Sequence, residues 1–206
     1  MTVTELRAMT KGRFEVYLND EFAFVLYKAE LKKYNIEIGR ELSDEILSEI
    51  HTEVLSKRAK KRAMNLLLKS DMTEMKLRQK LMDGKYPLDI VDEAIEYVKS
   101  YKYIDDRRYA RSFIAFQSQS NSRNVVMRKL LEKGIDKSIV IEELEQFYDN
   151  DELNEGLEDD LIERLIRKKC KDLSALDYES KQKLMASIMR KGFSFGSVEK
   201  VLNRLT

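Results

Sequence analysis

The stretch VMRKLLEKGIDKSIVIEELEQF, residues 126–147, predicts two helices joined by a tight bend. Gly134 lies where the C-terminus of a helix favours a residue in the left-handed conformation. Asp136 follows two positions later and can cap the N-terminus of the next helix. The same local chemistry recurs at Gly192 and Ser194, which indicates that the helix pair is repeated within the chain.

An ungapped alignment shows three copies of this helix pair. The other two are residues 77–98 (LRQKLMDGKYPLDIVDEAIEYV) and residues 184–205 (LMASIMRKGFSFGSVEKVLNRL). The matching apolar positions are Leu77, Val126 and Leu184; Leu81, Leu130 and Ile188; Tyr86, Ile135 and Phe193; Val91, Val140 and Val198; and Ile95, Leu144 and Leu202.

A further helical stretch precedes each pair, and these stretches cover residues 56–70, 105–117 and about 157–171. Each repeat is therefore predicted to contain three helices arranged like a helix-turn-helix unit. A linear series of three such repeats predicts a mainly α protein with an elongated, curved body.

The first 27 residues predict a small β-sheet instead. Phe14, Val16 and Leu18 alternate with polar or amphipathic residues, which is typical of a half-buried strand. Asn19 and Asp20 indicate a turn into a second strand that ends at Tyr27, and residues 3–9 can add a third strand. Because a hairpin alone is marginally stable in water, we expect this sheet to pack on the helices that follow.

These patterns divide the chain into four parts. We expect an N-terminal hairpin with helices in residues 1–55, followed by repeats in residues 56–103, 104–149 and 150–206. An acidic, weakly patterned segment at residues 150–160 is interpreted as the linker that leads into the third repeat.

Composition and charge favour a helical protein that is not a general polycation. Charged residues make up 36% of the chain, there is one proline, and the formal net charge is +1. The net charge is −4 over residues 1–56, +5 over residues 57–103, and zero in each of the two remaining parts. The basic excess therefore lies in the first repeat alone.

The sequence predicts no enzyme, no cofactor and no metal site. His51 is the single histidine and has no cysteine or second imidazole at metal-ligand spacing. Cys170 is the single cysteine and is expected to be an inert structural residue in a reducing compartment. We find no signal peptide, no apolar run long enough to span a bilayer, no Gly-rich phosphate loop and no catalytic triad order. We expect a cytoplasmic monomer.

Several motifs resemble the RecX family. Residues 63–81 (AMNLLLKSDMTEMKLRQKL) look like the start of the RecX core, and residues 130–135 (LLEKGI) match a later segment. The most specific match is the family's Tyr-Ile/Leu-Asp-Asp signature with the aromatic residues that follow it. It corresponds to Tyr103, Ile104, Asp105, Asp106, Tyr109, Ala110 and Phe113. Two departures are Gly84-Lys85, where the family has Lys-Gly, and Lys102, where glycine is common.

The resemblance implies a non-catalytic inhibitor of the RecA recombinase that acts in homologous recombination, DNA repair and the SOS response. It implies that the repeats lie in the groove of the RecA–single-stranded-DNA filament and modulate ATP hydrolysis, strand exchange and filament extension or disassembly. In local physical terms the signature is structural. The two aspartates fall at a helix start, and Tyr109 and Phe113 share one face of that helix.

The candidate partner-binding residues are basic and lie in the first two repeats. Arginine is favoured because its guanidinium group can bind a carboxylate or a phosphate through two bonds. The candidates are Lys57, Arg58, Lys60, Lys61, Arg62, Arg78, Lys80, Arg107, Arg108, Arg111, Arg123, Arg128 and Lys129. Each could instead be part of a solvated helix face, and the sequence does not decide between RecA and phosphate as their partner.

The alternative hypothesis is a protein that binds single-stranded or duplex DNA directly through its helix-turn-helix-like repeats. A nearly neutral chain argues for weak DNA binding only, because each neutralised phosphate contributes to affinity through counterion release. A structural adaptor between other proteins is a third hypothesis.

Overall fold

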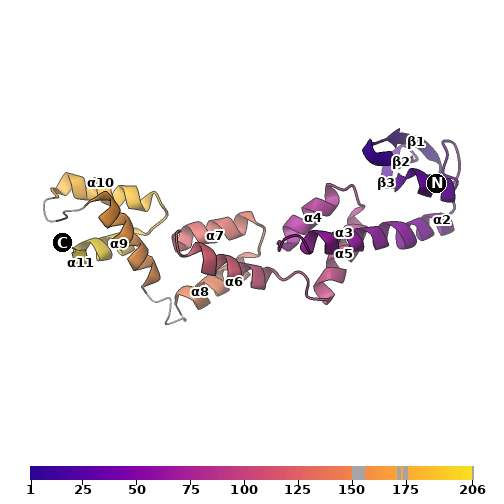
Figure 1. Ribbon diagram of the computed structural model, residues 1–206. Coiled ribbons are helices and arrows are strands. Elements are labelled where there is room, and N and C mark those ends of the chain that lie inside the picture. Colours follow the sequence, from indigo (N-terminus) through magenta and orange to yellow (C-terminus); the bar gives the residue numbers. More distant parts are fainter. Residues whose placement is uncertain (150–155, 171–172, 174–175, 206) are drawn as a thin grey trace. The chain divides into compact units, whose positions relative to one another are not determined.

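The computed structural model describes residues 1–149, 156–170, 173 and 176–205 (Figure 1). The chain forms two compact units, Met1–Asp105 and Asp106–Thr206. The first unit contains the β-sheet and the first repeat, and the second contains the other two repeats.

The predicted N-terminal sheet is present and has three antiparallel strands in the order β1 (Val3–Ala8), β2 (Arg13–Leu18) and β3 (Glu21–Tyr27). A 3₁₀ turn, η1 (Thr10–Gly12), connects the first two strands. Asn19 and Asp20 have φ angles of 48° and 69°, as a two-residue hairpin loop with positive φ at both positions requires.

The sheet packs on the helices of its own unit, as expected. Val16, Leu18 and Leu26 belong to one core cluster with Leu77 and Ile95 of the first repeat. The strand alternation has one exception, because Glu15 is only 4% exposed although the pattern placed it on the polar face. Its partners, described below, explain how a carboxylate is accommodated there.

The helices of the first unit are α1 (Lys28–Lys33), α2 (Asp44–Glu49), η2 (Ile50–Ser56), α3 (Lys57–Leu67), α4 (Glu74–Met82) and α5 (Leu88–Ser100). Ser43 caps α2 by accepting a hydrogen bond from the backbone N–H of Ile46 at 3.4 Å. Helix α2, the π-helical segment η2 and α3 are continuous, so one helix runs across the boundary that we expected between residues 55 and 56.

The second unit contains α6 (Asp106–Gln117), α7 (Arg123–Glu132) and α8 (Lys137–Tyr148), followed by α9 (Leu157–Lys169), α10 (Tyr178–Met189) and α11 (Phe195–Leu205). Asp136 caps α8 by accepting from the N–H of Ser138 at 2.7 Å, and Ser194 accepts from the N–H of Ser197 at 3.0 Å. Both predicted caps are therefore confirmed. Of the predicted linker, residues 150–155 lie outside the described residues, and α9 begins at Leu157.

The repeat alignment correctly places the core. Most of the aligned apolar side chains are buried, and each repeat contributes its own set to a core cluster. The three-helix, three-repeat architecture is therefore confirmed. The expected elongated, curved arrangement stays a prediction.

The three bends share one backbone conformation. Gly134 and Gly192 have φ angles of 78° and 92°, and Lys85, at the equivalent place in the first repeat, has a φ of 61°. The first bend therefore has the same left-handed φ as the other two bends of this chain, although a lysine takes the position that favours glycine. Lys102, the other departure, also has a positive φ, of 56°.

Candidate partner-binding residues

Three of the basic residues in α3 are engaged within their own unit. The guanidinium of Arg58 donates to the carbonyl of Val25 at 3.0 Å and to Glu30 at 2.5 Å, which ties α3 to β3 and α1. Lys60 pairs with Glu93 of α5 at 2.7 Å. Lys57 pairs with Glu53, one turn earlier on the same helix, at 2.5 Å. These side chains stabilise the fold and are only partly available to a partner.

Other basic residues of the first repeat form fewer ion pairs within the unit. Arg78 pairs with Asp92 and, at 3.6 Å, with Glu74. Lys61, Arg62 and Lys80 form no ion pair within 4 Å in the part of the chain that the structure describes, and the first two are exposed. Lys61 and Arg62 are therefore the residues of the basic run that are best placed to meet an external anion.

The predicted arginine stripe of α6 is organised around a buried acid. Arg107 contacts Glu142 of α8 at 2.6 Å and Glu143 at 2.8 Å, and Arg111 contacts Glu143 at 2.7 Å. The side chain of Glu143 is only 2% exposed. Burial alone would raise the pKa of Glu143, but hydrogen bonds from Arg111 and Arg107 outweigh burial and hold that pKa below its usual value.

The remaining candidates of the second repeat differ in their surroundings. Arg108 is exposed. Arg123 holds Asp149 with two bonds of 2.9 Å and lies over the ring of Tyr148. Lys129 donates to Gln117 at 2.9 Å and to Asn121, and Arg128 is exposed, with Glu132 at 3.7 Å. Arg108 and Arg128 are therefore the most accessible cations of this set.

The candidates do not all belong to one compact body. Those from Lys57 to Lys80 lie in the first unit, and those from Arg107 to Lys129 lie in the second. We therefore treat them as two sets, one on α3 and α4 and one on α6 and α7.

The signature residues serve the cores of both units. Ile104 is 4% exposed and belongs to the core of the first unit. Ala110 is fully buried in the second repeat, where Tyr109 and Phe113 stack with ring centroids 6.1 Å apart. Helix α6 begins at Asp106, so the aspartate pair lies at a helix start. Tyr109 and Phe113 therefore lie on one face of α6 and pack against the core of the second repeat.

Glu143 is the important residue that we did not identify from the sequence. The repeat alignment contained the signal, since Glu143 corresponds to Ala94 in the first repeat and to Val201 in the third. Both of these are fully buried. An acid at a position that is apolar in the other copies indicates a buried carboxylate that needs cationic partners.

The single histidine and the single cysteine each pack against other parts of the fold. His51 Nε2 lies 2.5 Å from Asp89 Oδ2, which joins η2 to α5. Cys170 is half-buried against the core of the third repeat. Among the described residues, no group of three or more His, Cys, Asp or Glu side chains could hold a metal ion. No described helix has both the length and the apolar character needed to cross a membrane.

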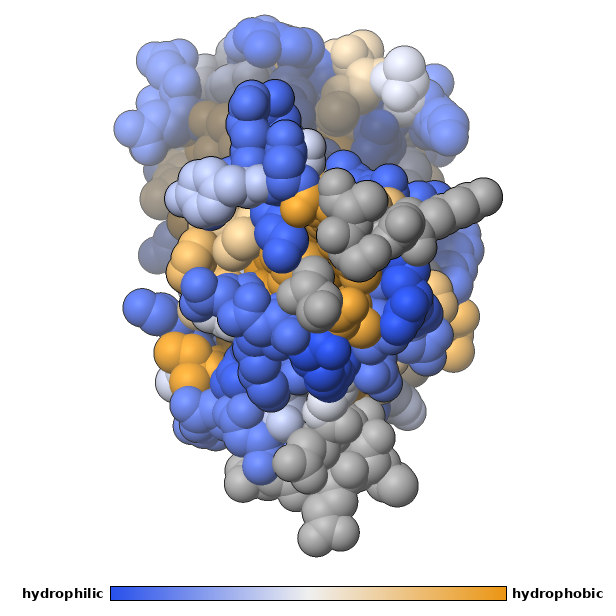
Figure 2. Space-filling model, turned by 90° about the vertical axis from the view of Figure 1, so that its left-hand side faces the viewer, coloured by the Kyte–Doolittle hydropathy of each residue, from blue (hydrophilic) through white to orange (hydrophobic). Residues whose placement is uncertain are grey.

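The second and third repeats are joined by polar contacts within the second unit. The hydroxyl of Ser122 donates to the carbonyl of Lys191 at 3.1 Å, and Asn124 donates to the carbonyl of Gly192 at 2.9 Å. Figure 2 faces the end of the chain formed by the third repeat, and its surface is mainly hydrophilic with apolar side chains exposed between the polar ones.

The fold defines the class of this protein: a helical-repeat protein of three tandem three-helix domains preceded by a small antiparallel sheet. Sequence models described as the first, second and third three-helix domains of RecX match residues 59–97, 105–144 and 158–202. The chain therefore belongs to the RecX family.

Individual relatives agree with this assignment over the whole chain. The "Regulatory protein RecX" of Clostridium tetani (strain Massachusetts / E88) is 29% identical over 208 residues, which cover 100% of this chain and 94% of the relative. That of Bacillus subtilis (strain 168) is 28% identical and is covered over 76% of its length. The matched relatives are thus named as regulatory proteins.

Solved structures show the same fold. A crystal structure of regulatory protein RecX superposes with a TM-score of 0.64 at 23% identity and covers 98% of both chains. RecX from Lactobacillus salivarius gives a TM-score of 0.65 at 23% identity, over 73% of this chain and 96% of that one.

Proposed function

We propose that this protein is a regulator, specifically an inhibitor, of the RecA recombinase, and that it binds in the groove of the RecA–single-stranded-DNA filament. The observation that carries the proposal is the presence of all three RecX domains in order along the chain. The resemblance of the signature residues 103–113 to the family supplies RecA as the partner. We further propose that the protein acts in the cytoplasm, as a monomer and without catalysing a reaction.

The proposed mechanism is occupancy of the groove. A body that fills the groove prevents duplex DNA from entering and hinders extension of the filament. The two sets of basic residues would set the rate of association and make binding sensitive to salt, because exposed charges are screened within about 10 Å at 0.1 M ionic strength. The most accessible contributors are Lys61, Arg62, Arg108 and Arg128.

The decisive measurement is ATP hydrolysis by preformed RecA filaments on single-stranded DNA, titrated with this protein far below one copy per RecA. We expect turnover to fall at these ratios, since each bound copy would affect the filament and so few copies cannot cover the DNA. A matched titration with bare single-stranded DNA measures direct DNA binding under the same salt conditions.

Two results would contradict the proposal. Inhibition that begins only when the protein saturates the DNA would indicate strand sequestration and favour the direct DNA-binding hypothesis. Turnover that does not change at any ratio would favour the adaptor hypothesis instead.

A further inference from the structure

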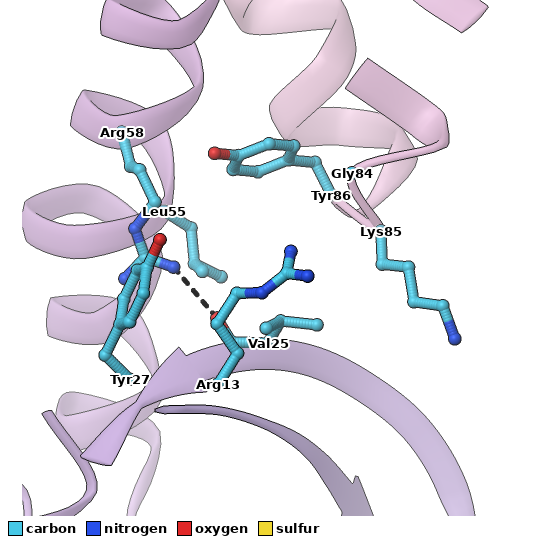
Figure 3. Close-up of a pocket in the computed structure, with 8 residues that line it drawn as sticks. All are labelled: Arg13, Val25, Tyr27, Leu55, Arg58, Gly84, Lys85 and Tyr86. Atoms are coloured by element: carbon cyan, nitrogen blue, oxygen red, sulfur yellow. Dashed lines mark hydrogen bonds between the residues drawn. The ribbon is translucent and has the colours of Figure 1, made fainter. Parts of the chain in front are cut away.

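A polar cavity lies in the first unit between the N-terminal sheet and the first repeat. It has a volume of about 40 Å³ and is partly open to solvent. Figure 3 shows side chains from β2, β3, α3 and the α4–α5 bend around it, among them Arg13, Tyr27, Arg58 and Tyr86. No acidic side chain is among its lining residues.

Arg13 supplies a guanidinium group without an acidic partner. Its Nε atom donates to the carbonyl of Thr10 at 3.4 Å, and no carboxylate of a described residue lies within 4 Å of the group. Figure 3 shows the guanidinium in the space between the strands and the ring of Tyr86. Both Nη atoms are therefore available to an external acceptor.

Arg58 also lines the cavity, and contacts with its neighbours hold its side chain in place. Its guanidinium donates to the carbonyl of Val25 and to Glu30, and it lies 4.9 Å from the centre of the Tyr27 ring. A side chain held by three contacts loses little further freedom when a ligand binds.

The local charge is positive. Arg13, Arg58 and Lys85 line the cavity, and the charge of Arg62 also acts on Tyr86. Glu30 pairs with Arg58 and Glu15 pairs with Lys85, so two of these four cations remain uncompensated. Burial raises the pKa of Tyr86, and its hydroxyl therefore stays protonated and able to donate at neutral pH.

The unusual order Gly84-Lys85 builds one side of the cavity. A Cβ atom at residue 84 would lie 3.1 Å from the ring of Tyr86, so glycine allows the ring to pack against the bend. Lys85 then takes the left-handed position and reaches Glu15 of the sheet. The departure from the family's Lys-Gly order thus has a local structural role.

We propose that this cavity binds a phosphate group, with the Arg13 guanidinium and the Tyr86 hydroxyl as direct donors and with Arg58 and Arg62 supplying positive potential. The cavity is lined by guanidinium and hydroxyl donors from separate elements, and guanidinium groups form strong, charge-assisted hydrogen bonds to phosphate oxygens. Two uncompensated cations also match the charge of a phosphate monoester. The proposal goes beyond the proposed RecA regulation, although Arg58 and Arg62 also belong to the first set of basic residues.

The test is a titration of the isotope-labelled full-length chain with inorganic phosphate at constant ionic strength, followed by NMR of the Arg13 Nε–H group and of the backbone amides of residues 84–86. We expect saturable shifts confined to these groups. Arg13→Gln should weaken binding by about tenfold or more, because it removes a charge-assisted contact. Tyr86→Phe should weaken it several-fold while the ring and the thermal unfolding midpoint are retained.

The control is Arg190→Gln, which makes the same charge change on an exposed residue after α10. Equal phosphate affinity of Arg13→Gln and Arg190→Gln would overturn the proposal, as would the absence of saturable shifts at millimolar phosphate. Shifts at Arg13 caused by a glutamate-rich peptide but not by phosphate would overturn it too, since they would indicate a carboxylate site.

The source of the phosphate is resolved by two further titrations. A short oligothymidylate that shifts the same signals and competes with inorganic phosphate would identify a nucleic-acid backbone. A nucleoside monophosphate that binds where the oligonucleotide does not would identify a small-molecule ligand. Thymidine without phosphate should leave the signals unchanged in both cases, and binding of thymidine at Arg13 would contradict the proposal.

Discussion

Two buried carboxylates, Glu15 and Glu143, each organise cations around them. Glu15 is 4% exposed and is bonded by Lys85 and by the hydroxyl of Tyr17 at 3.3 Å. Glu143 is 2% exposed and holds Arg107 and Arg111. A buried acid without such donors would cost several kcal/mol, so each carboxylate requires its cations in the folded state.

Lys85→Met should destabilise the first unit at neutral pH. The hydrogen bond from Lys85 is the main reason that the pKa of Glu15 is lowered, so its loss leaves a buried carboxylate with Tyr17 and Arg7 alone. We expect a loss of about 1–3 kcal/mol in the free energy of unfolding, measured with urea at pH 7.

The pH dependence of that loss identifies its cause. A carboxyl group whose folded pKa is lowered contributes stability above its unfolded pKa, near 4.3, and this contribution disappears as the pH falls through the folded pKa. The difference between Lys85→Met and the native chain should therefore shrink below about pH 4. A difference that stays constant down to pH 3 would show that the lysine stabilises the bend by packing alone.

The bends are the elements on which repeat geometry depends most directly. Gly192 has a φ of 92°, and a Cβ atom there would lie 2.6 Å from Ser122 Oγ and 2.7 Å from Val125 Cγ2. This bend joins α10 to α11 and also packs against the start of α7. Glycine is needed here both for its conformation and for the close approach of the second repeat.

Gly192→Ala should therefore cost more than backbone strain alone. We expect a loss of about 2–5 kcal/mol in the free energy of unfolding of the second unit, from left-handed strain of about 1–2 kcal/mol and overpacking of about 1–3 kcal/mol. The matched control is Gly156→Ala, at a φ of 81° with nothing within 4 Å of the added carbon. Its cost should stay near the strain value of about 1–2 kcal/mol. Equal costs for the two variants would exclude the close contact with Ser122 and Val125.

The helices and their caps were predictable because they depend on neighbouring residues. The periodic apolar positions and the caps at Asp136 and Ser194 needed only local sequence, and the repeat alignment added the core. The cavity at Arg13 was not predictable, since it forms only where the sheet meets the α4–α5 bend, far along the chain. For the same reason the pairing of Lys85 with Glu15 could not be foreseen from either segment alone.

At the scale of the whole molecule, the near-neutral net charge accompanies many ion pairs between basic and acidic residues. Each repeat joins its first and third helices by ion pairs: Lys60 to Glu93, Arg107 to Glu143, and Asp159 to Lys200 at 2.8 Å. Many cations that suggested a binding surface therefore also stabilise the repeats. A variant that removes them can lose activity through unfolding, and tests of partner binding must separate the two effects.

Charge reversal of Arg107, Arg108 and Arg111 is for this reason an ambiguous experiment in the native chain, because it would place acids beside the buried Glu143. Glu143→Leu removes the buried carboxylate, so the arginines can then be changed without leaving a buried acid unpaired. The equivalent residues Ala94 and Val201 are buried and apolar, and replacement of a buried ionic group by an apolar one is often neutral or stabilising. We expect Glu143→Leu to keep its helicity, measured by circular dichroism, and, if the proposed function holds, to inhibit RecA at least as well as the native chain.

In the Glu143→Leu background, changing Arg107, Arg108 and Arg111 to glutamine should leave the free energy of unfolding within about 1 kcal/mol of its parent, since no buried acid loses its partners. Inhibition of RecA-filament ATP hydrolysis should then fall about tenfold or more if these guanidinium groups contact the filament. The control replaces Lys168, Lys169 and Arg190 of the third repeat, three exposed cations, by glutamine in the same background. Undiminished inhibition by the α6 variant would remove this arginine set from the binding surface and leave Lys61 and Arg62 of α3 and Arg128 of α7 as accessible basic candidates.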